Sequence, residues 1–155
     1  MSREIEFFVP GAPVGKGRPR AARRGAGVAM FTPGKTADYE RLVAATAAAA
    51  LSCDALAAHQ LLDGPLEAVL EMRFPVPASW SKARRARALA GAEWHTSKPD
   101  ADNVAKAILD ACNGVVFRDD SQIVILIATK AFSEEPGVRV VIRECSLLTG
   151  IGGQQ

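Results

Sequence analysis

Four aspartates between Lys98 and Gln122 are spaced so that they can share one chemical task. Asp100 and Asp102 lie two residues apart where a helix is expected to begin, and Asp119 and Asp120 follow a short apolar run. Carboxylates gathered at one point repel one another unless a cation is bound or some of them are protonated. Hard oxygen donors without Cys or His nearby favour Mg²⁺ or Mn²⁺. The candidate metal ligands are therefore Asp100, Asp102, Asp119 and Asp120.

The chain is expected to bring the two aspartate pairs together. A helix of about 12 residues is about 18 Å long. A returning strand of four to five residues, Gly114 to Phe117, would cover roughly 15 Å in the opposite direction. Asp119 and Asp120 would then lie near the helix start. Lys106, one turn after Asp102, would face the same point, where its charge can offset a phosphate or help activate a water.

Each acid also has an ordinary structural explanation. Asp100 can cap the helix, and Asp102 can pair with Lys106 across one turn for a few tenths of a kcal/mol. Asp119 and Asp120 can form a polar turn between strands. These explanations account for the acids one at a time but leave their shared spacing unexplained.

Cationic side chains cluster in two segments that precede this acidic stretch, and Lys98 and Arg118 flank the aspartates themselves. One segment is a long Gly- and Pro-rich loop over residues 10–35, and the other is a short basic helix that begins near Lys82. The formal net charge is only +2, so the clustering, and not the overall charge, indicates a phosphodiester substrate. The candidate DNA-binding residues are Lys16, Arg18, Arg20, Arg23, Arg24, Arg84, Arg85, Lys98 and Arg118.

The hydrophobic pattern predicts the elements that must position these residues. Strands are expected over residues 4–9, 66–74, 123–132 and 138–145, the last two joined as a hairpin by a turn at 133–137. Helices are expected over residues 37–51, from Ser79 or Ser81 to Ala90, and from Pro99 to Cys112. Thr36 is the expected cap of the first helix, and residues 10–35 are expected to be irregular.

Helices and strands alternate only partly along the chain, which favours an α+β fold. We expect a mixed β-sheet covered by helices, in a single compact domain over residues 1–148. Residues 149–155 are Gly-rich and polar and are expected to form a flexible C-terminal tail.

The acidic and basic motifs together resemble the RusA family of Holliday junction resolvases. The similarity is carried by Lys98-Pro99-Asp100-Ala101-Asp102-Asn103-x-x-Lys106, by Asp110-x-x-Asn113-Gly114 and by Asp119-Asp120-x-Gln122. It includes Gly15-Lys16-Gly17-Arg18-Pro19-Arg20 and Thr32-Pro33…Tyr39-Glu40, and it spans most of the chain, to about Cys145. Val104 stands where the family usually has Leu, a harmless exchange on a buried face.

The resemblance implies a small homodimeric endonuclease that cuts four-way, branched double-stranded DNA with Mg²⁺ or Mn²⁺. By position, Asp100, Asp102 and Asp120 match the essential metal-site aspartates of the family, and Lys106 matches its catalytic-site lysine. Asp119 matches the neighbouring acid. The expected catalytic residues are thus Asp100, Asp102, Lys106 and Asp120, with support from Asn103, Asp110 and Gln122.

Three other functions fit parts of the pattern. A non-catalytic DNA-binding module would bind DNA without metal-dependent cleavage. A restriction-endonuclease site would need an acid-x-Lys motif after Asp120, where Ser121-Gln122-Ile123 stands. A metal-dependent phosphatase of small molecules would not need two clusters of cations.

Composition excludes several broad classes. Hydrophobic residues make up 48% and charged residues 23% of the chain, which is typical of a globular domain. Three separated cysteines and two histidines argue against a structural zinc site and favour a reduced, cytoplasmic setting. No apolar run reaches the roughly 20 residues of a membrane span, and residues 1–4 lead into a strand with no secretory signal pattern.

Four further side chains have open roles. Trp80 and Trp94 flank the basic helix and are expected to cover the edge of the core, with base stacking as the alternative. His95 is expected to be a partly exposed loop residue. Lys130 either reaches DNA or is the solvated end of an edge strand.

Overall fold

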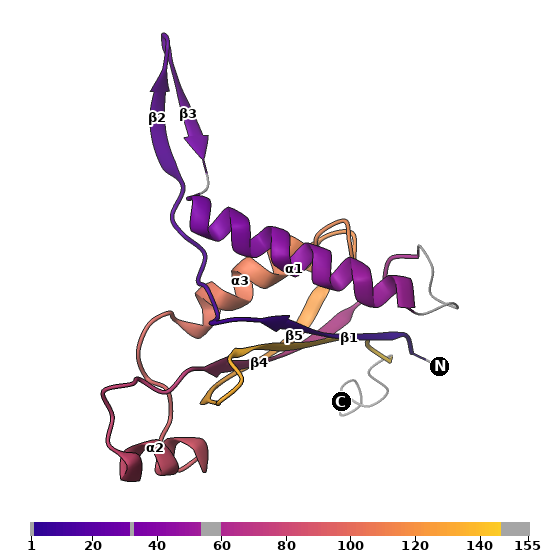
Figure 1. The fold of residues 1–155 in the computed structure, drawn as a ribbon. Coiled ribbons are helices and arrows are strands. Elements are labelled where there is room, and N and C mark those ends of the chain that lie inside the picture. The colour runs from indigo at the N-terminus through magenta and orange to yellow at the C-terminus, as the bar shows by residue number, and fades with distance from the viewer. Residues whose placement is uncertain (1, 32, 54–59, 147–155) are drawn as a thin grey trace, which may run out of the picture.

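A mixed sheet with two helices on one face forms the centre of the computed structural model, which describes residues 2–31, 33–53 and 60–146. The strand order is β1-β6-β4-β5. Helices α1 and α3 lie together over one face of this sheet (Figure 1). The bounds are β1 Glu4–Pro10, β4 Leu66–Phe74, β5 Ile123–Phe132, β6 Gly137–Glu144, α1 Gly34–Cys53 and α3 Ala101–Cys112. The expected α+β class is confirmed, whereas the predicted tail, 149–155, lies outside the described residues.

The core lies between the sheet and the two helices. Alternate residues of β4 from Leu66 to Phe74 are buried, as the alternating pattern predicts. They share one hydrophobic cluster with Val43 of α1 and with Val104 and Ile108 of α3, all fully buried. Each large aliphatic side chain buried in this way contributes about 1.5–3 kcal/mol to folding. Among the described helices, none has the length and hydropathy to cross a membrane.

Strand β4 separates the last two strands of the chain. It pairs with β5 in parallel and with β6 antiparallel, so the expected hairpin over residues 123–145 is wrong. The connection after β5 passes the end of β4, where the Ser133 amide donates to the Phe74 carbonyl oxygen at 2.9 Å. A local turn signal does not reveal which strand will insert between its two neighbours.

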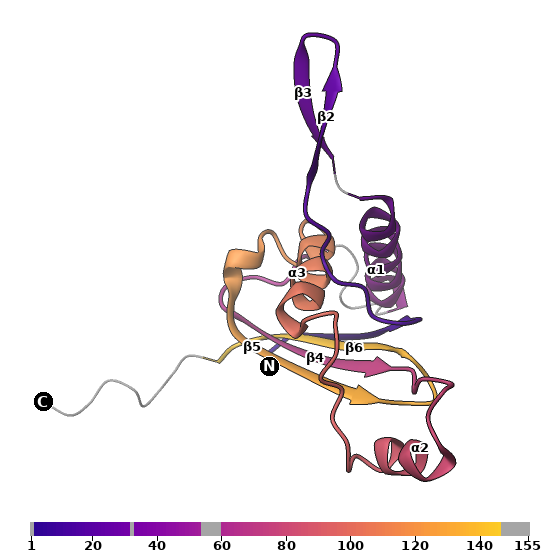
Figure 2. The ribbon, with the colours of Figure 1, turned by 90° about the vertical axis from the view of Figure 1, so that its left-hand side faces the viewer.

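The basic segment forms a second, two-stranded sheet. Strands β2, Arg20–Arg24, and β3, Gly27–Phe31, pair antiparallel and project from the body of the protein (Figures 1 and 2). The positive φ of Gly25, 61°, allows the tight connection between them. The expectation of an irregular loop is wrong here because neither face of the hairpin packs on the core, so no alternating apolar pattern marks its strands.

Thr36 anchors the segment that leads into the hairpin. It lies inside α1, and its buried hydroxyl oxygen accepts a hydrogen bond of 2.9 Å from the amide of Gly17. A Cβ at Gly17 would lie 2.8 Å from this oxygen, so the close approach requires glycine. The predicted capping role of Thr36 is wrong because the helix begins two residues earlier, at Gly34.

Candidate metal and DNA-binding site

Helix α3 presents its acids to the outside. Val104, Ala107 and Ile108 are buried, whereas Asp102 is exposed, as the helical spacing predicts. Asp100 is the N-terminal cap residue, but its side chain makes no capping hydrogen bond. Among the described residues, neither Asp100 nor Asp102 takes part in an ion pair. Both carboxylates are therefore free to bind a cation.

Lys106 does not neutralise Asp102. Its ammonium lies 3.4 Å from Asp110, one turn further along the helix, in an ion pair that faces solvent. The ordinary explanation of Asp102 as a helix-stabilising partner of Lys106 is thus not supported. Lys106 remains on the same outer side of α3 as Asp102.

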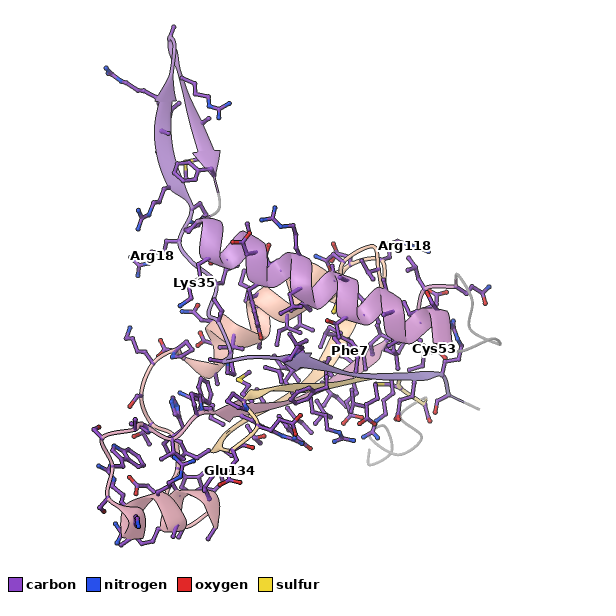
Figure 3. All side chains as sticks on the ribbon, viewed as in Figure 1. Phe7, Arg18, Lys35, Cys53, Arg118 and Glu134 are labelled. Atoms are coloured by element: carbon purple, nitrogen blue, oxygen red, sulfur yellow. The ribbon has the colours of Figure 1, made fainter. Side chains whose placement is uncertain are left out.

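A hollow of about 640 Å³ opens between the base of the hairpin and the start of α3. Asp100 and Asn103 contribute to its wall. The cations that line it are Lys16, Arg18, Arg20, Lys35 and Lys98. Figure 3 shows Arg18 and Lys35 on this side of the molecule. Because cations around a concave surface concentrate polyanions, the hollow is suited to a nucleic-acid backbone that passes beside Asp100.

Lys16 also joins α1 to α3. Its ammonium forms ion pairs with Glu40 and, at 2.9 Å, with Asp110. Its amide donates to the Asn103 carbonyl oxygen at 2.9 Å. Partial burial opposes protonation, but the hydrogen bonds to Glu40 and Asp110 raise the pKa of Lys16. The structure shows this anchoring role, whereas a contact between Lys16 and DNA stays a prediction.

Asp119 and Asp120 lie just beyond the other end of α3. The 3₁₀ turn η1, Asp120–Gln122, follows Asp119, whose side chain accepts a hydrogen bond of 2.8 Å from the Ser121 amide and caps the turn. Hydrogen bonds with the side chain of Ser121 and then with its amide lower the pKa of Asp119. Gln122 accepts from the Asp119 amide at 3.1 Å and donates to the Gly64 carbonyl oxygen at 3.1 Å. These bonds fix Asp119 and Asp120 beside the start of β4, whereas a support role of Gln122 in the site stays a prediction.

The expected meeting of four carboxylates within one chain does not occur. The 12 residues of α3 span about 18 Å and separate Asp100 from Asp120. Residues 114–117 form a tight turn, closed by a 2.7 Å bond from the Gly114 amide to the Phe117 carbonyl oxygen, and not a returning strand. Within the described ranges, no three Asp, Glu, His or Cys side chains are close enough to hold a metal ion. Figure 3 shows Arg118 far from Arg18.

Strand β5 is the segment that returns to the start of α3. It begins directly after Gln122, and near its end the ammonium of Lys130 donates to the carbonyl oxygens of Ser97 at 2.5 Å and Pro99 at 2.8 Å. One end of β5 therefore lies beside Asp120, and the other end lies beside Asp100.

The family model of the endodeoxyribonuclease RusA matches residues 10–143, a range that includes every candidate site residue. The chain belongs to the RusA endodeoxyribonuclease family. It is also 38% identical over 144 residues to the uncharacterized protein YqaN of Bacillus subtilis (strain 168), a match that covers 92% of this chain and 97% of that relative. Membership of the RusA family supports nuclease activity on Holliday junction DNA.

The basic helix of this RusA-family chain is held by its own contacts. Helix α2, Lys82–Leu89, is capped by Ser81 and lies on the opposite side of the sheet from α1 and α3 (Figure 2). Arg84 stacks over Trp80 at 3.5 Å and bonds to Glu93 at 2.6 Å. Arg85 lies 4.0 Å from Glu134. Contacts of Arg84 and Arg85 with DNA stay predictions, and Arg84 would first have to leave two partners.

Two of the open aromatic roles are settled by the RusA-family structure. Trp94 is 70% exposed, so the expectation that it covers the core edge is wrong. His95 is a partly exposed residue of an irregular segment, as expected, and its ring stacks on Phe74 at 3.8 Å and contacts Phe132 edge-on at 5.1 Å. His95 therefore fastens the segment before α3 to the ends of β4 and β5.

Sequence reasoning missed Lys35, which lines the hollow beside Asp100. One signal was available: a lysine in the first turn of a helix opposes the helix dipole, so a purpose other than helix stability is indicated. The sequence left two roles open for Lys130, contact with DNA and the solvated end of an edge strand. Its bonds to Ser97 and Pro99 show a third role, in which it positions the start of α3.

Proposed function

We propose that this chain is a Mg²⁺- or Mn²⁺-dependent endonuclease that resolves four-way DNA junctions by paired phosphodiester hydrolysis, in DNA recombination and repair. The observation that carries the proposal is the free carboxylate of Asp100 in the wall of a hollow lined by five cations, with the free carboxylate of Asp102 two residues further along the chain. A phosphate backbone attracted into the hollow would lie next to oxygen donors of the kind that Mg²⁺ prefers. The proposal includes a cytoplasmic setting, which is supported by three free cysteines.

The exposed edge of the sheet supports a homodimer. β5 is one of the two edge strands of the sheet, so one row of its backbone groups is unpaired. Four consecutive aliphatic side chains on it are exposed: Val124, Ile125, Leu126 and Ile127. Such a strand, both apolar and unpaired, is suited to pair with a second copy of itself.

An antiparallel β5–β5 pair about a twofold axis would complete the metal site. In this arrangement the start of one β5 lies beside the end of the other. Asp120 of the partner subunit would then approach Asp100 and Asp102, because Asp120 begins η1 just before β5 and Lys130 near the end of β5 contacts Pro99. The carboxylates that one chain keeps apart would meet across the dimer, once at each end of the strand pair.

The chemistry of such a site follows from its donors. A bound Mg²⁺ would polarise the scissile phosphate and lower the pKa of an attacking water. Asp100, Asp102 and the partner's Asp120 would hold and orient the reacting groups. Lys106 would offset charge on the phosphate, and the cations of the hollow would hold the strand in line for attack. The product would be a nick with a 5′-phosphate.

A cleavage assay on a synthetic mobile four-way junction tests the function. We expect paired nicks with Mg²⁺ and no cutting with EDTA, with Asp102→Asn, or on a linear duplex. Junction binding by Asp102→Asn should persist, because the cations of the hollow remain. Binding without cutting by the wild type under Mg²⁺ and Mn²⁺ would favour a non-catalytic DNA-binding module.

Mixed dimers test whether the site is shared. A dimer of one Asp102→Asn chain and one Asp120→Asn chain has one site with both changes and one wild-type site if the site is formed by two chains. The mixture of two inactive variants should then regain single-strand nicking of the junction. A mixture that stays inactive, although the heterodimers form, would show that each chain builds its own site.

A further inference from the structure

The β2–β3 hairpin carries a surface for which the metal site offers no role. Val28 is 68% exposed and Met30 is 64% exposed, on an element that projects from the body of the protein (Figures 1 and 2). Single exposed apolar residues are common, but neighbouring ones on one projecting face mark a contact surface.

The register of the hairpin gives it two different faces, because paired and alternate residues share a side of the ribbon. One face is mainly apolar and consists of Ala21, Arg23, Val28 and Met30. The other face contains two further arginines and consists of Arg20, Ala22, Arg24, Gly27, Ala29 and Phe31. The hairpin is therefore able to contact a charged surface on one side and an apolar surface on the other.

The charge of the hairpin indicates what covers it. Residues 11–31 contain five cations and no acidic residue. In the part of the chain that the structure describes, none of Arg18, Arg20, Arg23 and Arg24 forms an ion pair. Their full charge is thus available to a polyanion, and a two-stranded ribbon has the width that a DNA groove admits.

We propose that the hairpin is a wedge for branched DNA. Its arginine-rich face lies along a phosphate backbone, and Val28 and Met30 press against unstacked bases at the branch point. Inserted aliphatic side chains open base steps in this way in other DNA-binding proteins. This role depends on the proposed function, and it specifies that the hairpin contacts the branch point of the junction.

The position of the hairpin fits this role. Arg18 and Arg20, at its base, line the same hollow as Asp100. A branch point held by the hairpin would therefore place a backbone phosphate beside the carboxylates. The wedge supplies a preference for branched over linear DNA that a row of phosphate contacts cannot supply.

The test uses a chain made inactive by Asp102→Asn, with a junction that contains 2-aminopurine at the branch point. Val28→Thr combined with Met30→Gln keeps side-chain size and strand propensity but makes the face polar. We expect the affinity of the double variant for the junction to fall about 10-fold and its affinity for duplex DNA to change less than about twofold. The rise in 2-aminopurine fluorescence that reports unstacked bases on binding should disappear. Restoring the apolar face with Val28→Ile and Met30→Leu should restore both signals.

Two controls separate the wedge from charge and from general surface effects. Arg20→Gln combined with Arg24→Gln should weaken junction and duplex binding together. The slope of the logarithm of the binding constant against the logarithm of salt concentration should become shallower by about 0.9 for each phosphate that is no longer neutralised. Leu42→Gln changes an exposed leucine on α1, away from the hairpin, and should leave junction affinity and fluorescence unchanged.

Equal losses of junction and duplex affinity in the Val28→Thr, Met30→Gln double variant, or an unchanged junction affinity, would overturn the wedge. A shift in sedimentation without a change in DNA binding would also overturn it, because a second copy of the chain would then cover the surface. Failure of the nuclease proposal gives a different result: the chain would open junctions at the branch point but never cut them under Mg²⁺ or Mn²⁺.

Discussion

The ammonium of Lys130 donates a hydrogen bond of 2.8 Å to the carbonyl oxygen of Pro99. This contact ties the edge strand to the residue that directly precedes Asp100. A second bond, to Ser97 at 2.5 Å, makes the attachment bidentate. The strand that is proposed to form the dimer is thus also the strand that positions one half of the proposed metal site.

Lys130→Met is expected to lower junction cleavage about 10- to 100-fold, as removal of a group that supports metal ligands usually does. Lys130→Arg should recover part of the loss because it keeps two donors. Binding of Mg²⁺, measured by calorimetry, should weaken in Lys130→Met, while metal-free junction affinity changes little. If Lys130→Met lowers only junction affinity, Lys130 contacts DNA and does not position Asp100.

Leu126→Lys is expected to produce a monomer that neither binds metal tightly nor cuts DNA. Two lysines would face each other near the twofold axis, and such repulsion costs several kcal/mol. Sedimentation would measure the change in mass. Leu42→Lys, at another exposed leucine, should stay dimeric. A Leu126→Lys monomer with full cleavage would contradict the shared site.

Lys16→Met is expected to lower the free energy of unfolding by about 1–3 kcal/mol, between the values typical of exposed and buried ion pairs. The side chain is only 22% exposed and pairs with Glu40 and Asp110. Lys106→Met is the matched control: its side chain is 60% exposed, so the cost should stay below about 0.5 kcal/mol. Urea titration measures both. Equal losses of unfolding free energy in Lys16→Met and Lys106→Met would show that Lys16 does not anchor the hairpin base.

His95 should make stability fall at mildly acid pH. Burial and then the charge of Lys130 lower the pKa of His95 from its ordinary value of 6.5. Because the unfolded chain binds a proton near that pH and the folded chain resists it, this stability is present above 6.5 and declines as the pH falls towards the folded pKa. Between about pH 8 and about pH 5, the melting temperature should fall more in the wild type than in His95→Phe. An equal fall in both proteins would remove His95 as the cause.

Local patterns predicted much of the fold. Alternation in β4 and the 3.6-residue spacing in α3 gave the correct buried faces, because each pattern is read within one element. The pairing of β4 with β5 instead depends on residues more than 50 positions apart, and no local signal encodes it. The hairpin escaped prediction because its side chains meet solvent on both faces.

The sequence predicted the outward orientation of the first two candidate aspartates but not the geometry of the candidate site. Asp100 and Asp102 are free and face outward, as the spacing requires. Asp120 lies at the far end of α3 because Gly114 begins a turn where a returning strand was expected. A single sequence does not show that two chains can supply one site, since the evidence for this lies in the exposed edge of a folded strand.

The place of β6 in the sheet has a consequence for how the chain acquires its structure. β6 is the last strand in chain order, yet it lies between β1 and β4 and pairs with both. Until residues 137–144 are synthesised, β1 and β4 have no strand to join them, and their apolar faces remain open to chaperones or to aggregation. A chain that ends before Gly137 therefore has a sheet that cannot close.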